Sequence, residues 1–262
     1  MIAAPYPHTL LARYAPVALA DLESVALLDR TDTKYLLTVA QLSAALEAVA
    51  GDYRVLEVGG ARLHHYRTLY FDTPDLTLFR HHHAGKAVRH KVRSRAYVDT
   101  GLSFLEVKEK NNKGRTVKHR IPTDGLVSDL HSQGGSFVAA HAPVEPGALQ
   151  PALWNDFHRI TLVGTRHAER LTVDLGLSFQ TDARHTATLP GIAIAELKQN
   201  GVDRTSPFMR QMRAAHVQPA GMSKYCVGVS LLHEGVRHNA FKPTLRAVEK
   251  LMEAARREPD LG

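Results

Sequence analysis

The sequence predicts an α+β fold in which eight antiparallel strands form a closed β-barrel, with helices packed outside it and at its ends. Three observations predict this fold. Segments of alternating polarity follow one another through the middle of the chain, and segments of helical periodicity lie before, between and after them. In addition, one face of most of these strands carries charged side chains, and this pattern bears on the choice between a barrel and a sandwich.

The composition is that of an ordinary globular protein. The chain has 262 residues, of which 44% are hydrophobic and 23% charged, and we expect residues 1–262 to form a single domain. No apolar run approaches the roughly 20 residues of a membrane-spanning helix, and the N-terminal residues lack a signal-peptide pattern, so we expect a cytoplasmic protein. The single cysteine, Cys226, lies in an apolar run and is predicted to be a buried core residue.

The first part of the chain combines helices and strands. Helical spacing of apolar residues predicts helices at 17–28 and 39–50, the second ended by Gly51. Residues that favour β-structure predict a strand at 31–37, between the two helices. The aromatic, alternating segment 64–72 is predicted to be a strand as well.

A short helix and three strands are predicted next. Thr73-Pro74-Asp75 supplies an N-cap, a proline at the first helical position and an acidic first turn, which predicts a helix at 74–83. Three consecutive histidines in this helix, 81–83, are expected on a solvated surface, because adjacent helix residues do not share a face. Strands are predicted at 87–98, 102–110 and 115–121. The last two are joined by Asn111-Asn-Lys-Gly114, a hairpin signal.

The last part of the chain begins with a segment of different composition. Residues 122–156 are rich in Gly, Pro, Ala and Ser and predict a helical or irregular insertion. Beyond it we predict strands at 157–163, 169–179 and 186–198, and helices at 207–216, 223–233 and 242–257. The last helix is basic, and its charges are expected to form a solvated face.

Alternation along the strands separates charged from apolar side chains. Successive side chains of a strand point to opposite faces, so Arg89, Lys91, Arg93 and Arg95 share one face with Tyr97. Other strands repeat the division, with charged faces that carry Glu106 and Lys108, Lys118 and Arg120, Arg170 and Asp174, and Glu196 and Lys198.

These charged faces could be the solvated surface of an ordinary sandwich, or they could line an interior. The interleaved helices favour the interior, because helices bury their apolar stripes against the apolar faces of strands and leave the charged faces to turn inward. An interior with so many cations requires water and a multivalent anion, since unpaired buried charge is strongly unfavourable. The formal net charge of +7 agrees with a polyanionic partner.

Short motifs at the charged positions occur in a fixed order. They are Thr31-Asp-Thr-Lys34-Tyr35, Tyr70-Phe-Asp-Thr-Pro74, Arg93-Ser-Arg95-Ala-Tyr97, Glu106-Val-Lys108, Val117-Lys118, Phe157-His-Arg159, Arg170-Leu-Thr-Val-Asp174, Glu196-Leu-Lys198 and Ser223-Lys224-Tyr225. In this series the sequence resembles the VTC domain, the polyphosphate polymerase domain of the CYTH-like triphosphate tunnel metalloenzyme superfamily.

The resemblance implies an eight-stranded tunnel that holds Mn²⁺ or Mg²⁺ and transfers the γ-phosphoryl group of ATP to inorganic polyphosphate. The phosphate-binding residues that it implies are Lys34, Arg93, Arg95, Lys108, Lys118, Arg159, Arg170, Lys198 and Lys224. Of these, the implied catalytic residues are Arg93, Arg95, Lys108, Arg159 and Arg170. The implied metal ligands are Glu196, by its position, and Glu106, which belongs to the same kind of Glu-x-Lys strand.

The chain departs from the related patterns at two places. CYTH proteins begin with Glu-x-Glu-x-Lys, whereas this chain has Arg30-Thr-Asp32-Thr-Lys34, which favours the VTC branch over a CYTH triphosphatase or cyclase. The position three residues before Lys224 is basic in VTC domains and is Gly221 here, so one phosphate contact is missing.

Three functions therefore stay open. The chain is expected to be a polyphosphate polymerase, with a module that binds polyphosphate or triphosphate, or a hydrolase of tripolyphosphate or nucleoside triphosphate, as the alternatives. A specific nucleic-acid partner is not expected, because bases stack on exposed aromatic side chains and the cationic row carries Tyr97 alone. The sequence identifies no membrane partner.

Overall fold

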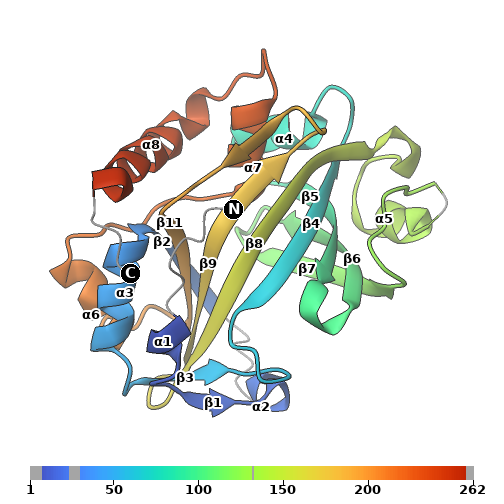
Figure 1. Ribbon diagram of the computed structural model, residues 1–262. Helices are drawn as coiled ribbons and strands as arrows, with labels where there is room; N and C mark the ends of the chain where they lie inside the picture. The colour runs from blue at the N-terminus through green and yellow to red at the C-terminus, as the bar shows by residue number, and fades with distance from the viewer. Residues whose placement is uncertain (1–7, 24–29, 132, 258–262) are drawn as a thin grey trace.

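A computed structural model describes residues 8–23, 30–131 and 133–257 of the chain (Figure 1). In these residues, eleven strands form one sheet. The main path of the sheet contains, in spatial order, β2 (Arg30–Thr38), β11 (Ile192–Asn200), β9 (Glu169–Gln180), β8 (Gln150–Gly164), β4 (His64–Asp72), β5 (Arg89–Tyr97), β6 (Leu102–Lys110) and β7 (Thr116–Thr123).

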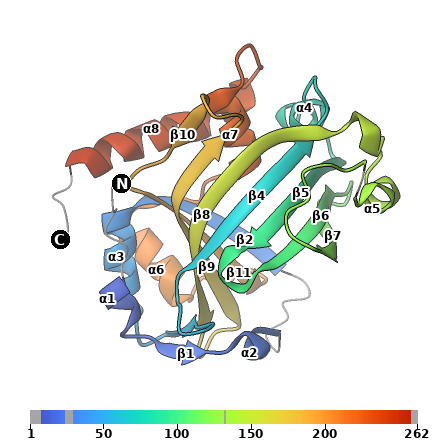
Figure 2. The ribbon, with the colours of Figure 1, turned by 45° about the vertical axis from the view of Figure 1, so that its right-hand side comes forward.

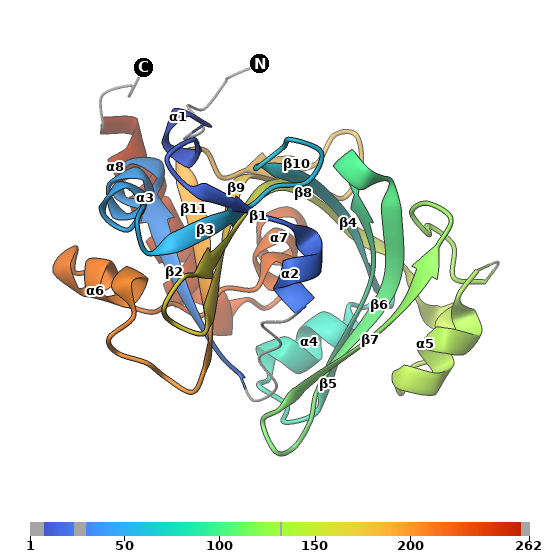
Figure 3. The same ribbon diagram turned by 90° about the horizontal axis from the view of Figure 1, so that it is seen from below.

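Every contact along this path is antiparallel, as the sequence predicts. Three short strands extend the sheet at its margins. β1 (Ala15–Val17) pairs in parallel with β3 (Tyr53–Leu56), β3 also pairs with β8, and β10 (Thr186–Thr188) pairs with β9. The sheet bends round on itself into a trough, which is clearest when it is viewed along the strands (Figure 3).

The predicted closure of the barrel is wrong. In the described part of the chain, the strands at the two ends of the path, β2 and β7, do not pair with each other. Figure 3 shows helix α4 (Thr77–His83) on the side where the two ends face each other. β7 contains Pro122, which has no amide hydrogen to donate and is typical of an edge strand. The fold is therefore a curved antiparallel sheet that is open along one side.

Helices cover the outer, apolar face of the sheet. Near β2, β11 and β9 these are α1 (His8–Leu11), α3 (Val39–Ala48) and α6 (Pro207–Ala214). There, Leu46 of α3 and Phe208 of α6 pack in one buried cluster with Val173 of β9. Thr38 begins α3 with a capping box, in which its hydroxyl accepts the Gln41 amide and the Gln41 side chain accepts the Thr38 amide.

On the other wall, α5 (Gly135–His141) covers the outer face of β6. Val138 of this helix packs with Leu105 and Val107, which alternate with the charged residues of the strand. The apolar faces therefore lie under helices and the charged faces turn inward, which confirms the prediction made from alternation.

One end of the trough is filled by apolar side chains. Helix α7 (Lys224–Leu232) lies inside the curve of the sheet, and α4 and α8 (Lys242–Arg257) lie beside it (Figures 2 and 3). Tyr225 and Val229 of α7 pack with Phe157 of β8 in a buried cluster. The helix approaches the sheet closely at Gly228, where an added Cβ would lie 2.5 Å from a methyl carbon of Leu153. A larger residue at this position would therefore require α7 or the side chains of Leu153 and Phe179 to move.

The remaining helical segments are short. They are α2 (Leu19–Glu23), η1 (Val98–Thr100), η2 (Pro146–Ala148) and η3 (Asn239–Phe241). The helix predicted at 17–28 is observed only as α2, and its last predicted residues lie outside the described ones. No described helix is both long enough and apolar enough to cross a membrane.

Several predicted elements differ from the observed ones. The strand predicted at 157–163 begins at Gln150 as β8, so the end of the segment predicted as a helical or irregular insertion, 122–156, is a strand. The helix predicted at 74–83 begins only at Thr77, because the carboxylate of Asp72 accepts the amides of Leu78 and Phe79 and fixes the start of α4 there. The strand predicted at 186–198 is two strands, β10 and β11, because the turn at Pro190 and Gly191 interrupts it. The short strands β1 and β3 were not predicted.

Candidate functional site

Charged side chains from seven strands and α7 meet on the inner face of the sheet. Three buried or half-buried carboxylates organise most of them, and each carboxylate is bonded by two cations. We call these three groups the paired section: Glu106 with Arg93 and Lys118, Asp174 with Arg159 and Lys224, and Glu196 with Lys34 and Lys198.

The first group joins three neighbouring strands. The Glu106 side chain is only 1% exposed; its Oε2 accepts from Arg93 Nε at 2.6 Å, and its Oε1 accepts from Lys118 Nζ at 2.6 Å. Burial alone would raise the pKa of Glu106, but Arg93, Arg95 and Lys118 outweigh it and hold the pKa far below its usual range. Glu106 is therefore a fixed anion with both oxygens engaged.

The second group connects α7 to the sheet. Arg159 bonds both oxygens of Asp174, with Nε to Oδ1 at 2.5 Å and Nη2 to Oδ2 at 2.8 Å, and Lys224 Nζ donates to Oδ2 as well. The Asp174 side chain is 4% exposed. Burial opposes its ionisation, but the two cations prevail and lower the pKa of Asp174. Forked contacts of this kind fix the plane of the guanidinium group.

The third group is the most accessible of the three. The Glu196 side chain is 20% exposed, its Oε1 lies 2.6 Å from Lys198 Nζ, and its Oε2 lies 3.4 Å from Lys34 Nζ. Burial would raise the pKa of Glu196, but Lys198 and Lys34 lower it well below its usual range. One oxygen of this carboxylate is therefore held only loosely.

Aromatic rings support the cations from below. The guanidinium carbon of Arg159 lies 5.0 Å from the ring centre of Tyr66, and Lys224 Nζ lies 4.5 Å from that of Phe157. Arg95 also lies over Phe157, at 5.7 Å, and its Nε donates to the Thr68 hydroxyl at 3.1 Å. The cations of β5, β8 and α7 thus lie against the rings of Tyr66 and Phe157, which we call the aromatic floor.

A buried carboxylate outside the paired section fixes α7, and hence Lys224. Asp72 is fully buried, accepts the amides of Leu78 and Phe79 at 2.8 Å each, and accepts the hydroxyl of Tyr225. Tyr225 follows Lys224 in the helix. Ser223, the N-cap of α7, accepts the Cys226 amide. The motif residues Asp72, Ser223 and Tyr225 therefore have structural roles here.

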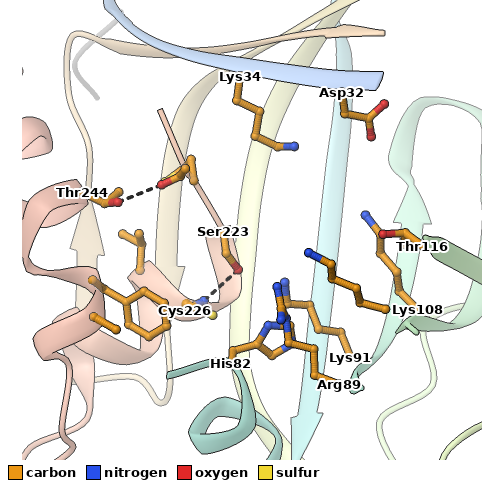
Figure 4. Close-up of a pocket in the computed structure, with 16 residues that line it drawn as sticks. Asp32, Lys34, His82, Arg89, Lys91, Lys108, Thr116, Ser223, Cys226 and Thr244 are labelled. Carbon is orange, nitrogen blue, oxygen red and sulfur yellow. Dashed lines mark hydrogen bonds between the residues drawn. The ribbon is translucent and has the colours of Figure 1, made fainter. Parts of the chain in front are cut away.

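Beside the paired section lies a cavity of about 550 Å³, which we call the lateral pocket. It opens between β2 and the β5 to β7 wall, and its charged lining residues are Asp32, Lys34, Arg89, Lys91, Lys108 and Lys110. Figure 4 shows the side chains of Arg89, Lys91 and Lys108 pointing from one wall, with Lys34 and Asp32 on the other. Burial, with repulsion from Arg93 and Lys91, lowers the pKa of Lys108 to about 8.

The structure brings most of the predicted phosphate-binding residues together. Eight of the nine belong to the paired section, the aromatic floor or the lateral pocket. The ninth, Arg170, lies opposite Lys198 in the register of β9 and β11, near the start of β9. Gly221 lines the lateral pocket, so the position without the expected basic residue borders this cavity.

The two predicted metal ligands, Glu196 and Glu106, have different surroundings. Both oxygens of Glu106 accept short bonds from cations, whereas Glu196 has a loosely held oxygen. Among the described residues, no three His, Cys, Asp or Glu side chains gather in a way that could hold a metal ion. The donor set would therefore suit a hard divalent cation only if most of the ligands came from phosphate oxygens and water, and of these two carboxylates Glu196 has the oxygen that could join them.

Sequence reasoning missed several functional candidates. Asp174 was placed on the charged face, but its pairing with Arg159 depends on a strand register that alternation does not reveal. Alternation puts Lys91 in the cationic row but indicates no role for it. The prediction of a solvated surface for His81–His83 is wrong for His82, which is half-buried, bonds the His90 carbonyl at 3.2 Å and lines the lateral pocket. Burial lowers the pKa of His82 to about 3, so this ring is neutral.

Solved structures with a similar course of the chain have low sequence identity to it. A Hippeastrum protein described as a candidate adenylyl cyclase with a dominant triphosphatase activity is 13% identical, with a TM-score of 0.48 over 76% of this chain and 94% of that one. A candidate adenylate cyclase from Bacillus halodurans is also 13% identical, with a TM-score of 0.45 over 75% of this chain and 96% of that one.

No curated protein sequence matches the chain. In contrast, the description of the VTC domain matches residues 29–233, which include every strand of the main path and α7. This match spans well over half of the sequence and contains all of the motifs on which the predicted resemblance rests. The chain therefore belongs to the VTC domain family.

Proposed function

We propose that this protein is a metal-dependent polyphosphate polymerase that transfers the γ-phosphoryl group of ATP to a polyphosphate chain. The observation that carries the proposal is the paired section: on the inner face of a VTC domain, six cations are fixed around three ionised carboxylates. Such a surface suits a ligand with several phosphates, because each phosphate can replace a carboxylate as the partner of a cation.

The proposed step is an in-line displacement at phosphorus. A terminal oxygen of the polyphosphate chain forms a bond to the γ-phosphorus, the bond from this phosphorus to the bridging oxygen breaks, and ADP leaves with that oxygen. The attacking oxygen is already ionised, so no general base is needed. What the protein must supply is alignment and neutralisation of charge.

The arginines and lysines would divide this work. Arg93, Arg95 and Arg159 are fixed by carboxylate, hydroxyl and aromatic contacts, so they can hold phosphate oxygens in forked geometry with little further loss of freedom. Lys108 has no carboxylate within 4.0 Å among the described residues, so its ammonium is free to follow a phosphate. Arg170 would contact phosphate farther along β9.

Glu196 would hold the divalent metal. A metal there would supply Lewis-acid neutralisation of phosphate oxygens. Lys34 and Lys198 would then lose part of their hold on Glu196 and turn toward the phosphates. Glu106, with both oxygens engaged, is better suited to orient Arg93 and Lys118 than to ligate the metal.

The test is to incubate the protein with γ-labelled ATP and Mn²⁺ or Mg²⁺ and to resolve the products on a gel. A ladder of polyphosphate is expected, and it should be lost in Arg159→Ala and in Glu196→Gln. Lys250→Met, which removes a charge from the exposed face of α8, is the matched control and should retain the ladder. Failure of all variants and the parent to produce polymer, although ATP binds, would refute the proposal.

The alternatives have distinct readouts in the same experiment. Release of orthophosphate without polymer would identify a hydrolase of tripolyphosphate or nucleoside triphosphate. Retained binding of polyphosphate with neither product would identify a binding module, a reading that Gly221 at the expected basic position favours.

A further inference from the structure

A buried carboxylate lies on the outer face of the sheet, away from the paired section and the lateral pocket. It belongs to Glu169, at the start of β9, which is 1% exposed. Its Oε1 accepts the hydroxyl of Tyr53 and, at 3.0 Å, that of Ser206, and its Oε2 accepts Gln199 Nε2 at 2.7 Å. Among the described residues, no cation forms an ion pair with this carboxylate, so hydrogen bonds alone compensate its burial.

The donors to Glu169 come from three other elements. Tyr53 lies in β3, and burial together with the charge of Glu169 raises the pKa of its hydroxyl, which therefore keeps the proton that it donates. Ser206 is the N-cap of α6. Gln199 lies in β11, and its Nε2 also donates to the Asp203 carbonyl at 3.1 Å, which holds the loop between β11 and α6. One carboxylate thus connects β3, β9, β11 and the start of α6.

The neighbours of Glu169 and Gln199 in the chain carry cations on the inner face. Arg170 follows Glu169, and Lys198 precedes Gln199. In the register of β9 and β11, Glu169 lies opposite Gln199 and Arg170 lies opposite Lys198. Successive side chains of a strand point to opposite faces, so the hydrogen bond on the outer face lies directly behind the two cations.

These two pairs lie where the strands end, and the end of a ladder opens most easily. β9 begins at Glu169 and β11 ends at Asn200. Like charges at directly opposed positions of an antiparallel pair repel each other, and Arg170 and Lys198 are such a pair. The bond between Glu169 and Gln199 therefore counteracts the opening of the ladder at the point where the two cations would force it apart.

We infer that Glu169 is a positioning residue, which acts from the outer face of the sheet and holds Arg170 and Lys198 at a fixed separation on the inner face. The inference rests on the proposed function for the role of these two cations. Glu169 itself contacts no ligand, because its carboxylate is buried on the other side of the sheet. Cations on a ladder that is already closed bind phosphate without the loss of freedom that ordering an open strand end would cost.

The experiment measures the Kd of tripolyphosphate by calorimetry in two backgrounds. We expect Glu169→Gln to weaken binding by about tenfold in the otherwise unchanged protein, because the amide cannot accept all three hydrogen bonds. In a background that carries Arg170→Met and Lys198→Met, the same substitution should change the Kd by less than about twofold, because the side chains that it positions are gone. A merely structural role would give the same loss in both backgrounds.

Two buried tyrosines provide a milder variant and its matched control. Tyr53 and Tyr14 are each 2% exposed, but the Tyr53 hydroxyl donates to Glu169, whereas the Tyr14 hydroxyl donates to the Leu46 carbonyl. We expect Tyr53→Phe to weaken tripolyphosphate binding by about threefold and Tyr14→Phe to leave it unchanged. This pair of variants repeats the test if Glu169→Gln does not fold.

Equal losses of affinity in the two backgrounds, or in Tyr53→Phe and Tyr14→Phe, would overturn the inference, as would an unchanged Kd in Glu169→Gln. The outcome is distinct from that of the polymerase test. If the parent makes no polymer but the loss in Glu169→Gln depends on Arg170 and Lys198, the positioning role is supported and the polymerase is refuted. Polymer synthesis by the parent with an unchanged Kd in Glu169→Gln would support the polymerase and refute the positioning role.

Discussion

The paired section and the lateral pocket lie on the same inner face and share strands β2, β5 and β6, yet they use cations in opposite ways. In the paired section, each cation is bonded to a carboxylate that the fold itself supplies, so its charge holds strands and α7 together. In the lateral pocket, the cations repel one another across the strands. A row of like residues on one strand can therefore be structural at one end and available to a ligand at the other.

The largest expected effect comes from breaking a pair. Arg159→Met should lower the free energy of unfolding by about 3 kcal/mol, because it leaves the buried Asp174 with Lys224 as its remaining cation. Urea denaturation measures this loss, with Lys250→Met as the control that should not change stability. If the urea concentration at the midpoint of unfolding were unchanged in Arg159→Met, the carboxylates would not hold the paired section together.

A second prediction separates the two roles of a carboxylate. Glu106→Gln should tighten binding of tripolyphosphate by about tenfold, because it removes a negative charge and releases Arg93 and Lys118 toward the ligand. It should also lower stability. The matched control is Glu109→Gln, on the opposite face of β6. Weaker binding in Glu106→Gln would show instead that the carboxylate is needed to orient the two cations.

A third prediction uses the pKa of Lys108, which is lowered to about 8. Below that pH the ammonium is charged and can bind phosphate, and above it the free protein loses this charge. Tripolyphosphate affinity should therefore fall as pH rises above about 8, by at most about tenfold per pH unit. In Lys108→Arg, which stays charged, the fall should be absent. A fall of the same size in both proteins would assign it to another group.

The smallest expected effect has the opposite sign to the first. Lys91→Met should raise the free energy of unfolding in the absence of anions by on the order of 1 kcal/mol, because it removes a half-buried charge that has no carboxylate partner within 4.0 Å among the described residues. Thermal unfolding in a buffer without phosphate would measure it, and added polyphosphate should reverse the order of stability. A loss of stability without anions would contradict the distinction between the two regions.

Much of this arrangement follows from local sequence. The alternation of Leu105 and Val107 with Glu106 and Lys108 identified the buried and the inward faces of β6, because a strand repeats every two residues and only one face can lie under a helix. The motifs likewise identified most of the cations, since their positions in the strands fix the side of the sheet on which they lie.

Other features depend on how distant strands meet. The pairing of Asp174 with Arg159 follows from the register of β8 and β9, which contains an irregularity between Asp156 and His158. The failure of β2 and β7 to pair is a property of two strands some 80 residues apart in sequence. The one local indication of it is Pro122, a residue typical of edge strands, in β7. Local patterns contain no direct information on either relationship.

The open side of the sheet has a consequence for how a long polymer gains access. A closed ring must be threaded from a free end, so its loading rate falls as ends become scarce relative to total polymer. A sheet that is open along one side admits the middle of a polymer chain sideways, so no chain end is needed. The lateral pocket lies along the side on which β2 and β7 do not pair, and polyphosphate with both termini chemically capped would therefore load as fast as uncapped polymer of the same length.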